Sequence, residues 1–458
     1  MEKEQTGGAE TRVTMNNYTK EDIIRLVEEE DVEFIRLQFT DIFGTLKNVA
    51  ITSSQLEKAL NNKCMFDGSS IEGFVRIEES DMYLYPDLDT FTIFPWRPQQ
   101  GKVARLICDV YRKDGTPYEG DPRYVLRKAV AEAEEMGYSM NVGPECEFFL
   151  FHTDEDGLPT TVTHEKGGYF DIGPLDLGEN ARRDMILTLA EMGFEIISSH
   201  HEIAPAQHEI DFHYDEAMVT ADNLMTFKMV VKTIAKRHGL HATFMPKPKS
   251  ETYGSGMHIN LSLYGRDGMN VLYNAEDVNG LSEEGYYFIG GLMKHMKAIT
   301  CITNPTVNSY KRFVPGYEAP VYMGWSAKTR GPLIRVSADK ERKSRLELRS
   351  PDATANPYLA LAVLLKAGLD GIKNKIMPPA NIDENIQKMT QERRDELHVE
   401  ELPRNLGDAT AELEKDQFLI DVLGGELAKK IIKANKKEYK EYCMQVTDWE
   451  IAHYLHRL

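Results

Sequence analysis

The stretch Pro144-Glu-Cys-Glu-Phe-Phe-Leu-Phe151 governs how the middle of this 458-residue chain folds. Side chains along a β-strand alternate between two faces, so Glu145 and Glu147 share one face. The opposite face carries Cys146 and Phe148, which suit a core. A strand that is apolar on one side and acidic on the other fits an antiparallel sheet with one face packed and one face open.

Two later segments repeat this pattern, Gly256-Met-His-Ile-Asn-Leu-Ser-Leu263 and Arg345-Leu-Glu-Leu-Arg349. In each, polar residues alternate with leucine, isoleucine or methionine, which is the period of a strand. The polar faces carry His258, Asn260, Ser262, Arg345, Glu347 and Arg349.

A fourth segment, His200-His-Glu-Ile-Ala-Pro-Ala-Gln-His-Glu209, carries Glu202 and Glu209 at an odd spacing. In one straight strand these two carboxylates would point to opposite faces. Pro205 lies between them and is expected to break the strand, because proline cannot donate to the ladder. Both carboxylates can then face one cavity.

Each of these polar faces, taken singly, is also what the solvent-facing side of an ordinary antiparallel strand looks like. Taken together, they indicate a cavity, because charged groups beside an apolar core must reach water or find partners. Carboxylates crowded in such a cavity repel one another unless cations neutralise them. Five glutamates and one histidine are mainly hard oxygen ligands, which favour Mg²⁺ or Mn²⁺ over a structural Zn²⁺.

The rest of the chain indicates an α+β protein. Thr19-Lys-Glu-Asp22 forms a capping box that begins a short helix. Strands are expected at Ile35–Phe39, Leu46–Ile51 and Val103–Val110, and long helices at Pro357–Ile372 and Leu427–Tyr454. The turn-rich segment Lys113–Pro122 marks a boundary, after which Asp121 caps a helix that starts with Pro122. We therefore expect a disordered N-terminal extension over residues 1–16, a small domain over 17–115 and a large domain over 116–458.

Composition limits the classes of function. The chain is 41% hydrophobic and 28% charged, and its formal net charge is −19 at pH 7. Such an acidic surface repels phosphate backbones and anionic lipid, so we expect no nucleic-acid partner and no membrane partner. The five cysteines are widely spaced without a paired motif, which fits a reducing compartment. With no apolar leader at the N-terminus, a cytoplasmic location is predicted.

The segments that carry these polar faces also resemble type I glutamine synthetase of bacteria and archaea, and the resemblance runs from about Thr19 to the C-terminus. The matching motifs are Gly143-Pro-Glu-Cys-Glu-Phe-Phe149, His200–Glu209, Gly254-Ser-Gly-Met-His258, Asn304–Pro320, Arg345–Asp352 and Phe66–Phe74. The resemblance implies a small N-terminal β-grasp-like domain and a large catalytic domain with a curved antiparallel sheet flanked by helices. It further implies a homo-dodecamer of two stacked hexameric rings, in which Asp41 reaches the active site of a neighbouring subunit.

The resemblance also implies a reaction, in which ATP phosphorylates the γ-carboxylate of glutamate and ammonia then displaces phosphate to give glutamine. Two Mg²⁺ or Mn²⁺ ions per active site would assist. The first ion would be held by Glu147, Glu202 and Glu209, and the second by Glu145, His258 and Glu347.

Other roles follow from the same resemblance. Asp41, Glu318 and Arg330 match catalytic residues: Asp41 helps to deprotonate ammonium, and Glu318 closes over the intermediate. Residues that match substrate-binding positions are Tyr169, Glu202, Gly254, Arg312 and Arg349, and those that match ATP-binding positions are Ser262, Arg335 and Arg345. The chain resembles the non-adenylylated branch, in which glutamine inhibits directly and Arg76 takes part.

Two departures concern the substrate side. The family usually has Asn-Gly-Ser-Gly-Met-His where this chain has Tyr253-Gly-Ser-Gly-Met-His258, and Thr329-Arg330-Gly331 differs from the usual Asn-Arg-Ser. Two alternatives therefore stay open. One is a γ-glutamyl ligase for amines or polyamines, and the other is a catalytically silent paralogue that serves as a regulator by binding partner proteins.

Overall fold

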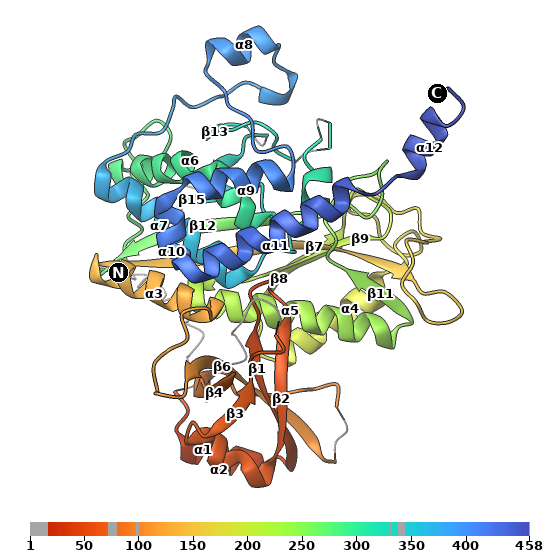
Figure 1. Cartoon of the computed structure of the whole chain (residues 1–458), viewed down its shortest axis with the longest axis vertical. Helices are drawn as coiled ribbons and strands as arrows, with labels where there is room; N and C mark the ends of the chain where they lie inside the picture. The colour runs from red at the N-terminus through yellow and green to blue at the C-terminus, as the bar shows by residue number, and fades with distance from the viewer. Residues whose placement is uncertain are drawn as a thin grey trace, which may run out of the picture. The chain divides into compact units, whose positions relative to one another are not determined.

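The computed structural model describes residues 17–71, 80–97, 100–314, 316–317, 319–329, 331–337 and 344–457 (Figure 1). The chain forms two compact units. The N-terminal unit comprises the segments that end at Phe39, Gly68 and Pro117. The large unit contains the short loop Thr40–Leu46 and the chain from Tyr118 onward.

The N-terminal unit is built on a mixed 6-stranded sheet among the described residues, with the order β2-β1-β6-β4-β3 and β5 paired to β6. Its strands are β1 (Val32–Thr40), β2 (Leu46–Thr52), β3 (Cys64–Asp67), β4 (Asp81–Pro86), β5 (Thr92–Ile93) and β6 (Lys102–Arg112). β1 runs parallel to β6, and its alternating residues Ile35 and Leu37 are fully buried. The predicted capping box is present on α1 (Lys20–Glu29), which buries Ile23 and Val27. The unit also contains a helix that the sequence did not predict, α2 (Leu56–Leu60).

The large unit contains a 9-stranded sheet, counted over the described residues, in the order β13-β14-β15-β12-β7-β9-β8, with β10 and β11 also paired to β7. Its pairs are antiparallel except β13 with β14. The strands are β7 (Tyr138–His152), β8 (Ile196–His201), β9 (Gln207–Phe212), β10 (Asp215–Glu216), β11 (Leu240–Thr243), β12 (Met257–Gly265), β13 (Trp325–Ser326), β14 (Ile334–Ser337) and β15 (Arg345–Leu348).

β7 is the strand on which this sheet is assembled, and its two faces differ as predicted. Cys146 and Phe148 are fully buried, whereas Glu145 and Glu147 are only partly buried. Behind the strand, Phe148 meets Phe227 of α5 (Ala217–Arg237) edge to face, with ring centroids 6.2 Å apart. The apolar back of β7 is thus sealed against a helix, and its acidic face is left for other contacts.

Helices make up most of the last third of the chain. The remaining helices of the large unit are α3 (Pro122–Glu135), α4 (Glu179–Glu191), α6 (Glu283–Thr303), α7 (Pro357–Asn374), α8 (Gln391–Glu396), α9 (Leu406–Lys415), α10 (Gln417–Leu423), α11 (Gly425–Cys443) and α12 (Asp448–Tyr454). Gly291 on α6 and Gly371 on α7 let the two helices pack closely, because a β-carbon on either would overlap the backbone of the other helix.

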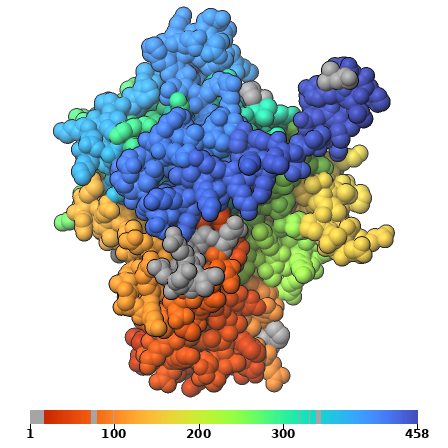
Figure 2. Space-filling view, viewed as in Figure 1, coloured from red at the N-terminus to blue at the C-terminus, as the bar shows by residue number. Residues whose placement is uncertain are grey.

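The predicted start of α3 is confirmed, with Asp121 as the N-cap and Pro122 in the first turn. The prediction of one helix over Leu427–Tyr454 is wrong. α11 ends at Cys443, and a new helix, α12, follows with Thr447 as its N-cap. A capping box fixes this start: the Thr447 side chain accepts from the backbone N–H of Glu450, and the Glu450 side chain accepts from the backbone N–H of Thr447. Figure 2 shows α11 lying across the surface of the large unit and α12 projecting beyond it.

All five cysteines are free thiols, and four of them are buried. Over the described residues, every helix is too short or too polar to span a bilayer.

Candidate active site

The acidic residues of the site face one another because of strand register. In the antiparallel pair of β7 and β12, Glu145 lies directly opposite His258. In the pair of β7 and β9, Glu147 lies directly opposite Glu209. Like charges at directly opposed positions destabilise a sheet, so the pairing of Glu147 with Glu209 is not explained by folding alone.

Glu145, His258 and Glu347 form one compact cluster, each offering a ligand atom within 4.8 Å of the others. His258 Nδ1 is 3.2 Å from Glu145 Oε2 and 3.7 Å from Glu347 Oε1. The three residues come from three neighbouring strands, β7, β12 and β15. Two carboxylates and one imidazole at this spacing are a donor set for a divalent cation.

Arginine and amide donors fix the carboxylates of this cluster. Glu347 is buried and accepts from Arg335 Nη1 at 2.8 Å and from Arg349 Nη1 at 2.5 Å. Asn260 Nδ2 donates to Glu145 Oε1 at 2.9 Å. Burial by itself would raise the pKa of Glu145, but the hydrogen bond and the charge of His258, with the Asn260 amide, lower that pKa to about 2. Glu145 is therefore held as an anion that is ready to accept a cation.

Glu147 begins a second acidic group. Its Oε2 accepts from Gln207 Nε2 at 2.8 Å and from the backbone N–H of Gly256 at 3.0 Å. Gln207 also donates to the backbone oxygen of Gly254, at 3.2 Å. These bonds orient one carboxylate oxygen, and no hydrogen bond from the described residues holds the other.

Glu202 and Glu209 complete this group, and His200 lies between them. His200 Nδ1 is 3.3 Å from Glu202 Oε1, and its Nε2 is 3.3 Å from Glu209 Oε1. Burial and then the charges of Glu147 and Glu209 raise the pKa of Glu202 to about 9. Burial, Glu147 and Asp211 raise the pKa of Glu209 to about 10. Among the described residues, negative charge predominates in this group, and a bound cation would relieve it.

The hairpin that carries these residues explains their odd spacing. β8 ends at His201 and β9 begins at Gln207, so Pro205 lies in the turn between them. Glu202 N–H donates to Gln207 O at 2.8 Å, which closes the turn. The predicted break at Pro205 is therefore confirmed, and both carboxylates come to one side of the sheet.

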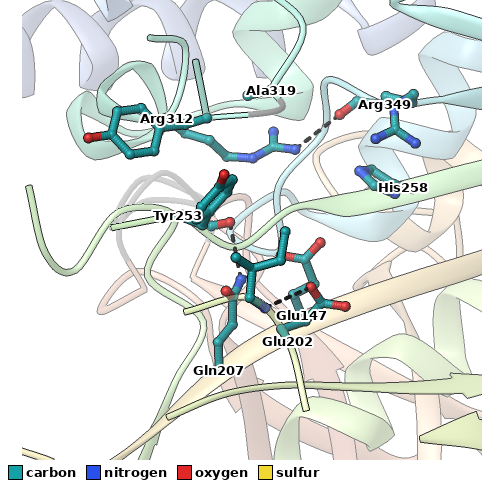
Figure 3. Close-up of a pocket in the computed structure, with 11 residues that line it drawn as sticks. Glu147, Glu202, Gln207, Tyr253, His258, Arg312, Ala319 and Arg349 are labelled. Carbon is teal, nitrogen blue, oxygen red and sulfur yellow. Dashed lines mark hydrogen bonds between the residues drawn. The ribbon is translucent and has the colours of Figure 1, made fainter. Parts of the chain in front are cut away.

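A pocket opens beside the second acidic group (Figure 3). It is lined by Glu147, Glu202, Ile203, Gln207, Tyr253, Gly254, His258, Arg312, Tyr317, Ala319 and Arg349. In Figure 3 the guanidinium of Arg312 points toward the backbone of Arg349, to whose oxygen Nη2 donates at 3.1 Å. Carboxylates for cations and guanidiniums for anions thus meet in one cavity, which suits an anionic substrate bound together with metal ions.

Gly254 is required by this packing. A β-carbon there would overlap the backbone oxygen of Pro246 and crowd the side chains of Lys247 and Arg312. A larger residue would push the pocket wall inward.

Other predicted residues lie farther from this pocket. Tyr169 is more than half exposed, but its ring packs edge to face on His200, with centroids 5.6 Å apart. Ser262 lies opposite Asn141 on β7, and Arg345 is exposed at the start of β15.

Asp41 lies in the loop Thr40–Leu46. It is 4% exposed, and its Oδ1 accepts from the backbone N–H groups of Phe43 at 3.0 Å and Thr45 at 2.9 Å. Within this chain, Asp41 therefore organises its own loop. Three predicted residues, Arg76, Glu318 and Arg330, lie outside the described residues.

Sequence reasoning missed several contributors. Gln207, His200, Tyr317 and Asp211 were not predicted, although the first three lie within quoted motifs. Alternation along β9 gives Asp211 the same face as Glu209, and this was the available signal. No local signal identifies Tyr317 as a wall of the pocket.

A further cluster of possible ligands needs no metal. Glu165, Asp176, His201 and His208 are buried close together. Arg182 Nη1 donates to Asp176 Oδ2 at 2.7 Å and to His208 Nδ1 at 2.8 Å. The guanidinium already supplies the positive charge there.

Comparison with known proteins identifies both units. The family model described as "Glutamine synthetase, catalytic domain" matches residues 119–454, and "Glutamine synthetase, beta-Grasp domain" matches residues 31–113. Glutamine synthetase of Clostridium saccharobutylicum is 61% identical over 443 residues, which cover 97% of this chain and 100% of that protein. Glutamine synthetase of Staphylococcus aureus strain N315 is 54% identical over 440 residues, covering 96% and 98%.

Solved structures agree. A structure titled "GmaS/ADP complex-Conformation 1" superposes with a TM-score of 0.86 at 32% identity, covering 95% of this chain and 99% of that one. The cryo-EM structure of Plasmodium falciparum glutamine synthetase superposes with a TM-score of 0.85 at 26% identity, with the same coverage.

Proposed function

Since this chain belongs to the glutamine synthetase family and is by that membership a glutamate–ammonia ligase, we propose that its acidic cavity joins ammonia to the γ-carboxylate of glutamate with ATP. The observation that carries the assignment to this cavity is the opposition of Glu145 to His258 and of Glu147 to Glu209. The facing carboxylates of Glu147 and Glu209 are relieved by a cation between them, and Arg312 and Arg349 line the pocket beside them.

The donor sets fit two divalent ions, which we propose to be Mg²⁺ or Mn²⁺. Glu147, Glu202 and Glu209 would hold one ion on the substrate side, and Glu145, His258 and Glu347 would hold the other on the phosphate side. Bound there, the ions would neutralise the charge that spreads over the phosphoryl group as it moves from ATP to the carboxylate.

The protein's own side chains then position the reactants. Arg335 and Arg349 both donate to Glu347. We propose that Arg335, with Ser262 and Arg345, binds the ATP phosphates, and that Arg349 binds the glutamate substrate. The guanidinium of Arg312 donates to the backbone oxygens of Arg349 and Ser350 and is thereby fixed in the pocket lining. We propose that it binds the charged end of the substrate there.

Ammonium has no lone pair, so a carboxylate must take its proton before it attacks. We assign this work to Glu202 with Asp41 and Tyr169. The contact that supports it is the chain from Tyr169 to His200 to Glu202, which places an aromatic ring and a carboxylate on the same side of the sheet. Arg330 and Glu318 would act on the same intermediate.

The assembly is a further part of the proposal. The C-terminal segment exposes large apolar side chains, namely Met444, Val446, Trp449, Ile451 and Leu455. Such a patch on a projecting segment is typical of a protein interface. It supports a homo-oligomer, which we propose to be a dodecamer of two hexameric rings that works in the cytoplasm. Direct inhibition by glutamine with the participation of Arg76 is proposed on the sequence motif alone.

A direct assay tests the function. Purified protein is given glutamate, ATP and Mg²⁺ with either ammonia or a panel of primary amines and polyamines, with and without glutamine as inhibitor. We expect glutamine to form with ammonia faster than any amide forms with an amine. Faster turnover with an amine would contradict the proposal, and the absence of any metal-dependent ATP binding in calorimetry would indicate a silent protein.

A further inference from the structure

Three side chains meet at the wall of the substrate pocket. The rings of Tyr253 and Tyr317 pack edge to face, with centroids 5.6 Å apart and an interplanar angle of 80°. The ammonium group of Lys247 lies 3.9 Å from the centroid of the Tyr317 ring. Both tyrosines line the same pocket as Glu147 and Glu202. Tyr317 is therefore contacted by one aromatic ring and by one cation.

Lys247 is held rigidly. Its backbone N–H donates to Asn308 Oδ1 at 2.8 Å, and the Asn308 amide donates back to its backbone oxygen at 3.0 Å. Its ammonium group also donates to the backbone oxygen of Thr252. The side chain is 6% exposed, so the contact with the ring is made away from bulk water, where a cation–π contact is strongest.

Tyr253 is anchored from the other side. It packs on a buried apolar cluster formed by Phe149, Phe151, Ala204 and Ala206. Phe149 and Phe151 belong to β7, and the two alanines belong to the turn after Glu202. The ring thus ties the wall of the pocket to the strand and the turn that carry the acidic residues.

Tyr317 itself lies outside the helices and strands of the described residues. Its backbone oxygen accepts from Ala319 N–H at 2.7 Å, and Ala319 O accepts from Gln387 Nε2 at 3.1 Å. From these contacts we infer that Lys247 and Tyr253 are positioning residues, which hold Tyr317 as a wall that keeps water from the activated substrate. The inference deepens the proposed function and rests on it.

The chemistry makes this role measurable. In ligation, the nitrogen of ammonia attacks the acyl carbon of γ-glutamyl phosphate, the bond to the phosphate oxygen breaks, and glutamine and phosphate leave. If water attacks the same carbon, the same bond breaks, and glutamate and phosphate are formed instead. The second course consumes ATP without product, so the ratio of phosphate released to glutamine formed reports how well water is excluded.

The experiment measures that ratio with glutamate, ATP, Mg²⁺ and ammonia for Tyr253→Ala, Tyr317→Ala and Lys247→Met. We expect the ratio to rise roughly threefold or more in each variant, because each loses an aromatic or cation–π contact. Tyr253→Phe keeps the ring and is expected to keep the wild-type ratio. Lys247→Met keeps the length of the side chain, so it stays informative if an alanine variant folds poorly.

Tyr124→Ala is the matched control, since it removes a ring that packs under Lys128 at 5.2 Å on α3, outside the pocket lining. Its ratio is expected to equal that of the wild type. Wild-type ratios in Lys247→Met and Tyr317→Ala would overturn the inference while leaving the proposed function intact. A wild-type protein that forms no glutamine would instead overturn the proposed function, and the inference with it.

Discussion

At the scale of single residues, the site is a set of carboxylates in two electrostatic states. Hydrogen bonds from His258 and Asn260 keep the pKa of Glu145 low in spite of its burial, whereas burial and neighbouring anions raise the pKa of Glu202 and Glu209. The first state is an anion with donors already in place. The second is an excess of negative charge that a divalent cation would relieve.

Replacing Glu209 by glutamine tests whether the carboxylates with a raised pKa form a cation site. Burial, Glu147 and Asp211 raise the pKa of Glu209 to about 10, well above the value of an unfolded glutamate, so at pH 7.5 the group destabilises the metal-free fold. Glu209→Gln is therefore expected to raise the thermal unfolding midpoint in EDTA. At the same time kcat/KM with ammonia should fall by about 10²-fold or more, because a charged ligand is lost.

The exposed Glu216→Gln is the control for Glu209→Gln, and neither quantity should change in it. A Glu209→Gln enzyme with wild-type activity would exclude Glu209 from the metal site.

Replacing Asn260 tests whether Glu145 depends on its hydrogen-bond donors to bind metal. Its amide donates to Glu145 Oε1 at 2.9 Å and to Gly143 O at 3.1 Å. Asn260→Ala is expected to weaken Mn²⁺ binding about 10- to 100-fold, the usual cost of removing a residue that orients a metal ligand. Titration calorimetry measures the affinity, with Asn374→Ala on α7 as the control. Unchanged affinity would mean that Glu145 needs no support from Asn260.

At the scale of secondary structure, three helices of the large unit are joined by contacts between one histidine and two aspartates. His295 on α6 contacts Asp370 on α7 at 3.1 Å and Asp416, the N-cap of α10, at 2.6 Å. Both ring nitrogens of His295 contact carboxylates, so this one side chain links three helices.

This link gives a pH-dependent prediction. Burial opposes ionisation of Asp416, but the hydrogen bond with His295, the hydrogen bond from the Leu419 backbone and the nearby positive charge together outweigh it and lower the pKa of Asp416. A lowered folded-state pKa stabilises the protein above the unfolded value, near pH 4, and this contribution is lost as pH falls through the folded value. Asp416→Asn keeps the helix cap but removes the charge, and it should cost about 1–3 kcal/mol of unfolding free energy at pH 7.

Thermal unfolding over pH 3–8 checks this expectation. The difference between Asp416→Asn and wild type should shrink toward zero at the acid end. Asp421→Asn, at an exposed position of the same helix, is the control. A difference that stays constant with pH would show that the charge of Asp416 is not the cause.

At the scale of the whole molecule, the C-terminal segment exposes apolar side chains that the contacts within one chain do not explain. α12 projects with Trp449 and Ile451 exposed, at 59% and 46%, and Leu455 directly after the helix is 70% exposed. Side chains of this size are seldom left in water on a projecting helix unless another surface covers them.

Ending the chain after Met444 tests this surface. The truncated protein is expected to sediment as a smaller species than the full chain and to lose activity, since the proposed role of Asp41 requires a neighbouring subunit. Sedimentation velocity and the ammonia assay measure the two effects. Arg457→Gln, which changes an exposed polar residue of the same segment, should leave both unchanged. An active monomer would contradict the assembly.

The sequence by itself determined which side chains share a face. Glu145 with Glu147, and His258 with Asn260, follow from the period of two along a strand, and Asp121 with Pro122 marks the start of α3 by local hydrogen bonding. These are properties of neighbours in the chain. The break between α11 and α12 was missed because apolar residues continue on both sides of Thr447.

Only the tertiary structure decided which faces meet. That Glu147 lies opposite Glu209, that His200 lies between two carboxylates and that Tyr317 packs on Tyr253 depend on strand register and on contacts between segments far apart in the chain. Register is set by the packing of the whole sheet, since a shift of one residue would turn every side chain of a strand to the other face. No local pattern carries that information, because the free energy that selects the register comes from residues on other strands.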